Sequence, residues 1–250
     1  MNASAWPDRS AFWFLLVFIS SFMAYWLPME SPKLKERLAR RLGAERGALW
    51  YFLCNKSWGA FLFGVLCSIA ALRIFPGSSL PQMGLAWPRT NPGPYLGLTL
   101  ALSAALAGAN RLRARRIALK GGDFGRYPEI QTVRWTWATT ALDAAFWSLY
   151  LFGYELLFRG TLLFPLAAML GPWTAAGINA ALYAAVHIPK GPAEAIGALF
   201  LGLALCPITL ASGSMLPAFA IHAALAISND LFAHSFRNGK GGASAPEDRR

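Results

Sequence analysis

Long apolar segments constrain the fold of this chain more than any other feature. From Trp135 to Phe232 strongly polar side chains are few, and shorter apolar runs precede this region. The runs cover residues 12–27, 49–75, 95–109, 137–169, 173–187, 193–210 and 217–232. Several approach the length of about 20 residues that a helix needs to cross a bilayer. The sequence therefore predicts an all-α polytopic membrane protein, a bundle of about seven to eight transmembrane helices.

The composition agrees with a membrane protein. Of the 250 residues, 56% are hydrophobic and 14% are charged, which is too apolar for an ordinary soluble domain. The formal net charge is +11, but the basic residues cluster between apolar runs and do not form a solvated basic surface. This pattern indicates orientation signals that contact anionic lipids, and it argues against nucleic acid as a partner.

Two basic clusters predict the orientation of the chain. One lies at residues 32–46 and the other at residues 111–134, and both are expected in loops. Two predicted spans separate them, so both loops fall on the same side, which the positive-inside rule assigns to the cytoplasm. We expect a multi-pass protein of a bacterial inner membrane. The first apolar run is interpreted as a retained helix in preference to a signal peptide, because no small-residue cleavage site follows it.

A carboxylate and a guanidinium lie four residues apart inside the longest apolar run. Glu155 and Arg159 share a helical face, so their side chains can meet. Ionisable groups inside a membrane segment usually mark a functional site. The alternative is a buried ion pair that only fixes the packing of the helix.

Other polar side chains recur at helical spacing in the same half of the chain. Asn179, Tyr183 and His187 follow one another at intervals of four, and His222 and Asn229 are seven apart. Each set forms a stripe on one helix face. Lipid would leave such stripes without hydrogen bonds, so they are expected to face the bundle interior or a water-filled cavity.

Depth along the helices suggests which of these groups meet. Glu155 and His187 each lie 16 positions from the turn at Gly171, or about 24 Å along a helix. An antiparallel hairpin would place them at one level, whereas His222, close to the start of its helix, fits less well. A carboxylate and a histidine around a water molecule can activate it for attack on a carbonyl, with a second histidine donating to the oxyanion.

A zinc site is the alternative for the same side chains. Glu155, His187 and His222 would supply three ligands and a water the fourth. No HExxH motif is present, and none of these pairs has a tight chelating spacing. We therefore expect no cofactor.

Three motifs in this half of the chain are similar to those of the CAAX protease and bacteriocin-processing family, also called CPBP or Abi. They are Glu155-Leu-Leu-Phe-Arg159, Tyr183-Ala-Ala-Val-His187 and His222. The family pattern is EExxxR, an aromatic residue followed by xxxH, and HxxxN or HxxxD. The resemblance implies a metal-free glutamate-type intramembrane endopeptidase. Together with the apolar runs, the basic clusters and the Gly-, Ser- and charge-rich C-terminal end, it predicts three regions: N-terminal transmembrane helices with two basic cytoplasmic loops (1–136), a catalytic helix bundle (137–236) and a disordered cytoplasmic tail (237–250).

The chain departs from the family pattern at two positions. Tyr154 stands where the first glutamate is expected, and Ala226 stands where Asn or Asp is expected. Asn229, one turn beyond Ala226, is a possible replacement as oxyanion donor. Support of substrate or oxyanion is assigned to four residues: Tyr154, Tyr183, Asn179 and Asn229.

The resemblance implies hydrolysis of a peptide bond in a membrane-anchored protein or peptide, as in C-terminal processing or removal of a sorting signal. In this interpretation Glu155 activates water, His187 shares the proton and His222 stabilises the oxyanion, while Arg159 orients Glu155. The alternative is a catalytically inactive protein of the same fold that binds a peptide or protein partner.

Overall fold

The computed structural model describes residues 6, 9–29, 31–88, 91–132 and 135–238. Arg134 lies outside the described residues. Disorder was predicted for residues 237–250, of which 237 and 238 belong to the last helix and 239–250 lie outside the described residues. The described part of the chain is helical and contains no strand. Its elements are α1 (Ser10–Met29), α2 (Pro32–Leu42), α3 (Ala44–Gly59), η2 (Ala60–Leu66), α4 (Cys67–Ile74), α5 (Pro92–Leu119), α6 (Trp137–Glu155), η3 (Leu156–Leu162), α7 (Leu163–Leu170), α8 (Pro172–Ala185), η4 (Ile188–Lys190), α9 (Pro192–Ser212) and α10 (Leu216–Asn238).

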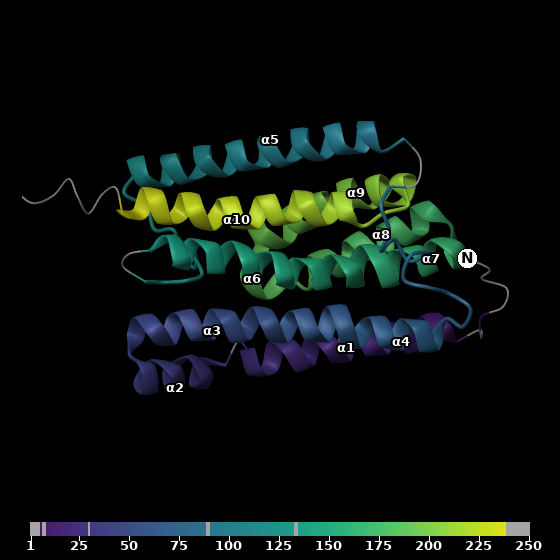
Figure 1. Cartoon of the computed structure of the whole chain (residues 1–250), viewed down its shortest axis with the longest axis horizontal. Helices are drawn as coiled ribbons and strands as arrows, with labels where there is room; N and C mark the ends of the chain where they lie inside the picture. Colours follow the sequence, from purple (N-terminus) through teal and green to yellow (C-terminus); the bar gives the residue numbers. More distant parts are fainter. Residues whose placement is uncertain (1–5, 7–8, 30, 89–90, 133–134, 239–250) are drawn as a thin grey trace, which may run out of the picture.

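The helices run along the long axis of the molecule (Figure 1). Two of them are long rods with a π-helical turn in the middle: α3, η2 and α4 form one, and α6, η3 and α7 form the other. The second rod packs against the first on one side and against α10 on the other, and α5 covers α10. This places η3 near the centre of the bundle.

Five helices or rods in the described residues are long and apolar enough to cross a membrane. They are α1, the rod α3–α4, the rod α6–α7, α9 and α10. Two further helices, α5 and α8, belong to the same bundle, since α5 packs on α10 and α8 packs on α9. The predicted all-α polytopic fold is confirmed.

Both basic segments that were expected to be loops contain helix. Residues 32–42 form the short helix α2, which begins at Pro32 and packs against α3. Proline at the first helical position costs no hydrogen bond, and this segment is strongly amphipathic, which explains the helix. The second basic segment continues α5 as far as Leu119. The loop prediction was wrong for residues 32–42 and 111–119, because clustered charge was given more weight than helix propensity, whereas residues 120–132 do form a loop.

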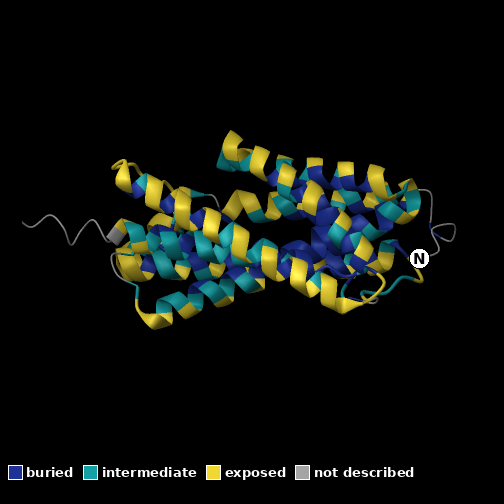
Figure 2. Cartoon of the chain, turned by 90° about the horizontal axis from the view of Figure 1, so that it is seen from above, coloured by how far each residue is buried: buried dark blue, intermediate teal, exposed yellow. Residues whose placement is uncertain are grey.

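The two long rods approach each other closely at a pair of glycines. A Cβ atom added to Gly153 would lie 2.9 Å from the Ala60 carbonyl oxygen and 3.0 Å from the Gly64 nitrogen. Aromatic side chains fill the space beside this crossing, and Phe22 stacks on Phe63 with 4.5 Å between ring centroids. The buried residues gather in the half of the bundle remote from α2 (Figure 2). The other half is therefore less completely packed.

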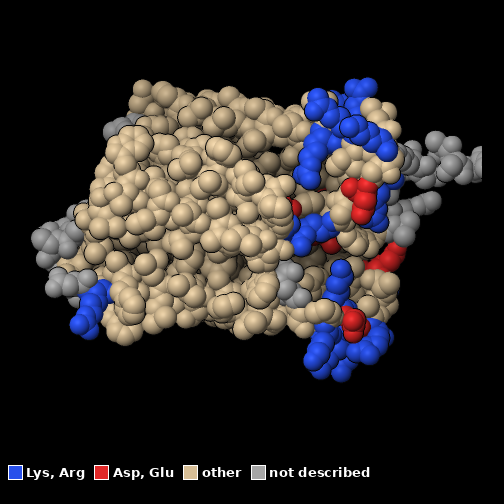
Figure 3. Space-filling view, turned by 180° about the vertical axis from the view of Figure 1, so that it is seen from behind, with Lys and Arg blue, Asp and Glu red and all other residues tan. Residues whose placement is uncertain are grey.

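Lys and Arg side chains gather at one end of the molecule, which we call the basic end (Figure 3). It contains α2 and the C-terminal part of α5, so both predicted basic clusters lie on the same side. The flanks of the bundle are apolar. Large exposed side chains on the flanks include Phe12, Leu16, Phe61, Leu100 and Phe200. Such a surface fits the hydrocarbon region of a bilayer.

Candidate active site

The central π-helical turn η3 positions the charged pair that the sequence singled out. All seven residues of η3 are buried, and Arg159 lies in the middle of the turn. A π-helical turn loosens the regular backbone hydrogen bonding and is frequent at functional sites. Here the Asn179 side-chain amide donates to the Phe158 carbonyl at 2.6 Å. A side chain from α8 thus stabilises the irregular turn.

Glu155 is fully buried and has two charged or ionisable neighbours. Its Oε1 atom lies 2.6 Å from Nδ1 of His222, and its Oε2 atom lies 3.4 Å from Nε of Arg159. The Arg159 guanidinium also lies over the Tyr183 ring, 4.2 Å from its centroid. A buried carboxylate needs such partners, because a lone charge in an apolar interior is strongly unfavourable. The pair is therefore coupled to a histidine and a tyrosine from two other helices.

His222, and not His187, is the histidine in contact with Glu155. The depth argument expected the reverse, and it failed because α10 does not begin at the surface. The residues before it, Ser214 and Met215, are buried, and the Met215 backbone N–H donates to the Gly84 carbonyl at 2.9 Å. The helix thus starts inside the bundle. Its second turn already reaches the level of Glu155.

The hydrogen bonds of His222 define the orientation of its ring. With Glu155 accepting at 2.6 Å, Nδ1 is the donor nitrogen of the neutral ring. Nε2 is then the acceptor, and it lies 3.3 Å from the Tyr183 hydroxyl. This is the arrangement in which a buried carboxylate holds an imidazole with its basic nitrogen directed away from the carboxylate.

His187 lies just beyond the end of α8 and hydrogen-bonds within its own turn. Its Nδ1 atom donates to the Tyr183 carbonyl at 2.8 Å. The neutral ring then has an unprotonated Nε2. The His187 ring is 4.9 Å from the Tyr183 ring and 6.3 Å from the Tyr154 ring, measured between centroids. His187 therefore contacts the aromatic residues of the site and not the carboxylate.

Tyr154, which replaces the expected first glutamate, lies among the other site residues. Its ring centroid is 5.7 Å from that of Tyr183 and 5.8 Å from that of His222. Its hydroxyl is buried without a hydrogen-bond partner among the described residues. An unpaired buried hydroxyl is costly. It is a donor that a substrate oxygen can satisfy.

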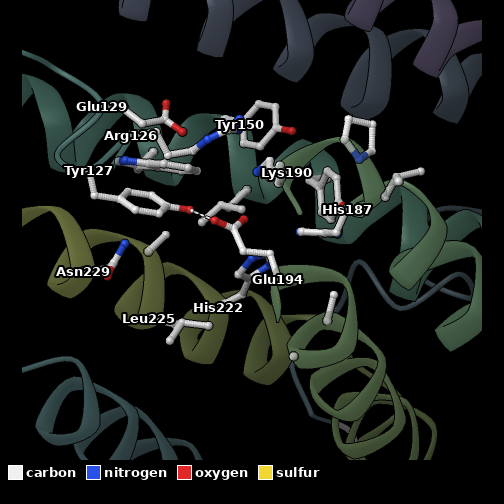
Figure 4. Close-up of a pocket in the computed structure, with 18 of the residues that line it drawn as sticks. Arg126, Tyr127, Glu129, Tyr150, His187, Lys190, Glu194, His222, Leu225 and Asn229 are labelled. Atoms are coloured by element: carbon white, nitrogen blue, oxygen red, sulfur yellow. Dashed lines mark hydrogen bonds between the residues drawn. The ribbon is translucent and has the colours of Figure 1, made fainter. Parts of the chain in front are cut away.

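A cavity of about 700 Å³ leads from these residues to the basic end. Tyr154, Tyr183, His187 and His222 line its inner part, and Figure 4 shows the two histidines reaching it from α8 and α10. Glu155 and Arg159 do not line the cavity. The site thus has a layer of side chains that line the cavity and a charged layer behind it.

The two asparagines assigned to substrate or oxyanion support differ in position. Asn179 does not line the cavity, because its amide nitrogen binds Phe158 and its oxygen lies 3.4 Å from the Cys206 thiol. Its role is to hold η3. Asn229 does line the cavity, two turns along α10 from His222 and toward the basic end (Figure 4).

The zinc alternative required Glu155, His187 and His222 to converge. Within the described part of the chain, no three His, Cys, Asp or Glu side chains are grouped closely enough to hold a metal ion. His187 directs Nδ1 to a backbone carbonyl, whereas His222 directs Nδ1 to Glu155. This donor set does not fit a three-ligand zinc site.

A second polar cluster beside the cavity was not predicted. Lys56 lies 2.6 Å from Glu129, and its ammonium sits 3.3 Å from the centroid of the Trp147 ring. Asp230 accepts from the Trp147 indole N–H and from the Glu129 backbone N–H, both at 3.1 Å. Asp143, the nearest other carboxyl group, is also fully buried. The sequence signal for this cluster was the presence of ionisable residues in or beside apolar runs, but only the fold reveals that these residues meet.

This cluster anchors the loop between α5 and α6 across the cavity. Burial alone would raise the pKa of Glu129, but the ammonium groups of Lys56 and Lys190 outweigh burial and hold the pKa below its ordinary value. Burial and the carboxylate of Glu194 raise the pKa of Tyr127, so its phenol stays neutral and donates to Glu194 at 3.0 Å (Figure 4). The loop is thus tied to α3, α9 and α10.

In a comparison with known proteins, one segment of the chain matches a protein family. Residues 135–228 match the family model described as Rce1-like, type II CAAX prenyl endopeptidase Rce1-like. No curated protein and no solved structure matches the chain. The matched segment contains Glu155, Arg159, His187 and His222, and the family is a protease family. The predicted relationship to the CAAX protease family is confirmed by this match.

Proposed function

Since residues 135–228 form an Rce1-like domain, we propose that the protein is an intramembrane endopeptidase that cleaves a membrane-anchored polypeptide in the cavity beside Glu155 and His222. The observation that carries the proposal is the contact of 2.6 Å between these two side chains at the inner end of the cavity. A carboxylate that accepts from the Nδ1–H of an imidazole fixes the orientation of the ring and stabilises the imidazolium that forms during the reaction.

In the proposed reaction His222 is the general base. Nε2 accepts a proton from water while the water oxygen bonds to the carbonyl carbon of the substrate. The proton then passes to the amide nitrogen as the carbon–nitrogen bond breaks, which leaves a carboxylic acid and an amine. Glu155 stabilises the imidazolium in between and does not itself contact the substrate. Compared with the roles that the sequence suggested, this assignment moves the activation of water from Glu155 to His222, and it leaves the oxyanion to other donors.

Tyrosine hydroxyls are the proposed donors to the oxyanion. The Tyr154 hydroxyl has no partner among the described residues, and Tyr183 donates only a long bond to His222. Both side chains line the cavity. Donors that are already fixed in position stabilise the developing charge without reorganisation. Tyrosine at position 154 is thus compatible with catalysis.

We propose that the basic end faces the cytoplasm, as the positive-inside rule predicts. The cavity opens at that end. A substrate would then enter from the cytoplasmic half of the membrane. Water, which peptide hydrolysis consumes, reaches the site by the same route.

The test uses the full chain reconstituted with membrane-anchored reporter peptides, whose cleavage is followed by mass spectrometry. We expect His222→Gln to lower kcat by about 10² to 10⁴-fold with little change in peptide binding. Glu155→Gln should lower kcat in the same way. The matched control is His234→Gln, which alters a histidine of the same helix that does not line the cavity.

Cleavage by His222→Gln at a rate close to that of the wild type would refute the proposed mechanism. The alternative, a catalytically inactive protein of the same fold that binds a peptide, predicts a different result. In that case the wild type would bind the peptides but cleave none of them, and His222→Gln and Glu155→Gln would leave binding unchanged.

A further inference from the structure

The wall of the cavity has an excess of positive charge at its outer part. Five cationic side chains and two carboxylates line the cavity. One cation, Lys56, is fully buried and bound to Glu129. The other four come from four separate elements and form what we call the cationic mouth: Lys35, Arg113, Arg126 and Lys190.

Neither carboxylate of the wall forms an ion pair with a side chain of the cationic mouth. Glu129 forms its ion pair with Lys56 at 2.6 Å, and Glu194 accepts the Tyr127 hydroxyl at 3.0 Å. Figure 4 shows Arg126 and Lys190 among the residues that line the cavity, and its dashed line marks the bond from Tyr127 to Glu194. For the four cations of the mouth, no ion pair is found within the described residues.

Membrane orientation does not account for this convergence. The positive-inside rule depends on the number of Lys and Arg residues near a span and not on the direction of their side chains. Other residues of the same clusters, such as Arg40, Arg41, Arg115 and Arg116, are present at the basic end and do not line the cavity. Like charges on the wall of a cavity repel one another, and low-dielectric walls focus their field on what enters.

We propose that the cationic mouth binds acidic side chains of the substrate polypeptide, on the flank that lies toward the basic end from the cleaved bond. The inference rests on the proposed function, because the same polypeptide must occupy the inner site. Carboxylates of Asp and Glu would pair with Arg126, Lys190, Arg113 and Lys35 while the apolar part of the substrate reaches Tyr154 and His222.

This arrangement would also reject most other membrane proteins. Their cytoplasmic flanks carry an excess of Lys and Arg, which the cationic mouth repels. Charge repulsion against wrong partners contributes to specificity as much as attraction to the right one. An acidic flank would therefore distinguish a substrate from the bulk of the membrane proteome.

The test compares two anchored peptides in vesicles of neutral phosphatidylcholine. Both have the same apolar helix of about 20 residues, followed by a flank of alternating Asp and Glu in one and of Asn and Gln in the other. We expect the wild type to prefer the acidic peptide by about tenfold in binding and in kcat/KM, since several partly exposed ion pairs contribute. High salt should reduce the preference.

Two double variants locate the effect. In Arg126→Gln with Lys190→Gln, the ratio of acidic to neutral peptide should fall to about one. In the control, Arg115→Gln with Arg116→Gln, the loss of charge is equal but the residues do not line the cavity, so the ratio should persist. Equal binding of both peptides by the wild type, or an equal loss in both double variants, would overturn the inference.

Two further outcomes separate this inference from the proposed function. If the acidic peptide binds selectively but neither peptide is cleaved, the cationic mouth is supported and the protease assignment fails. If both peptides are cleaved equally, and the Arg126 and Lys190 variant changes only the response to added anionic lipid, the mouth binds lipid headgroups and the inference fails.

Discussion

At the scale of single residues, the buried guanidinium of Arg159 depends on its charged and aromatic neighbours. It is fully buried, lies 3.4 Å from the Glu155 carboxylate and covers the Tyr183 ring. Two buried charges cost desolvation energy that their attraction only partly repays. Removing one of them leaves the other uncompensated. The pair is therefore expected to be strongly coupled in stability.

A double-mutant cycle tests this coupling. Arg159→Met should destabilise the protein by about 3 to 5 kcal/mol, because Glu155 then keeps a buried charge without its cation. Adding Glu155→Gln should restore part of the loss, so the two effects are not additive. The measurement is unfolding in detergent. Arg111→Met, on the exposed face of α5, is the control and should change stability by less than about 0.5 kcal/mol. Additive effects of the two substitutions would contradict the coupling.

At the scale of secondary-structure elements, the contact between the two long rods positions the site. Gly153 precedes Glu155 by two residues, and its backbone lies against Ala60 and Gly64 of the other rod. Only small residues such as Gly and Ala allow this approach. The crossing holds the N-terminal helices against the helix that carries the carboxylate.

Gly153→Ala should therefore destabilise the bundle and impair activity. The added methyl group would meet backbone atoms at 2.9 to 3.2 Å, and overpacking of this kind costs about 1 to 3 kcal/mol. Gly177→Ala in α8 is the matched control, since nothing lies within 4 Å of its added Cβ. It should leave stability unchanged or raise it by up to about 1 kcal/mol. Thermal unfolding measures both, and equal effects would argue against the close crossing.

At the scale of the whole molecule, the two ends of the bundle differ in charge. The basic end contains both basic clusters and the opening of the cavity, whereas the loop that includes Trp87 lies at the opposite end. The apolar flanks lie between them. The side of the membrane that the basic end faces decides which compartment supplies the substrate.

Cysteine labelling in intact cells tests the proposed orientation. Trp87→Cys and Lys120→Cys are introduced at exposed positions, after replacement of Cys54, Cys67 and Cys206. A membrane-impermeant maleimide should label position 87 in intact cells and position 120 only after permeabilisation. The reverse pattern would place the basic end outside and refute the proposed cytoplasmic entry. Labelling of both after permeabilisation controls for folding and access.

Much of the fold was predictable because its signals are local. Apolar runs, Pro and Gly marked the helices, and the rod α6–α7 as a whole, α8 and α9 begin and end close to the predicted limits. The spacing of Glu155 with Arg159 identified the charged pair, and Tyr183 and His222 were assigned to the same site. Local patterns also misled, because α2 and the end of α5 are helices in which a run of charge suggested loops.

The sequence by itself determined that the chain forms a helical membrane bundle with a charged pair and two histidines in its second half, since helix periodicity and apolar length depend only on neighbouring residues. Only the tertiary structure decided that Glu155 contacts His222 and not His187, because that depends on how deep α10 begins. The same holds for the pairing of Lys56 with Glu129 and for the cationic mouth. Contacts between distant segments follow from packing, which no local pattern contains.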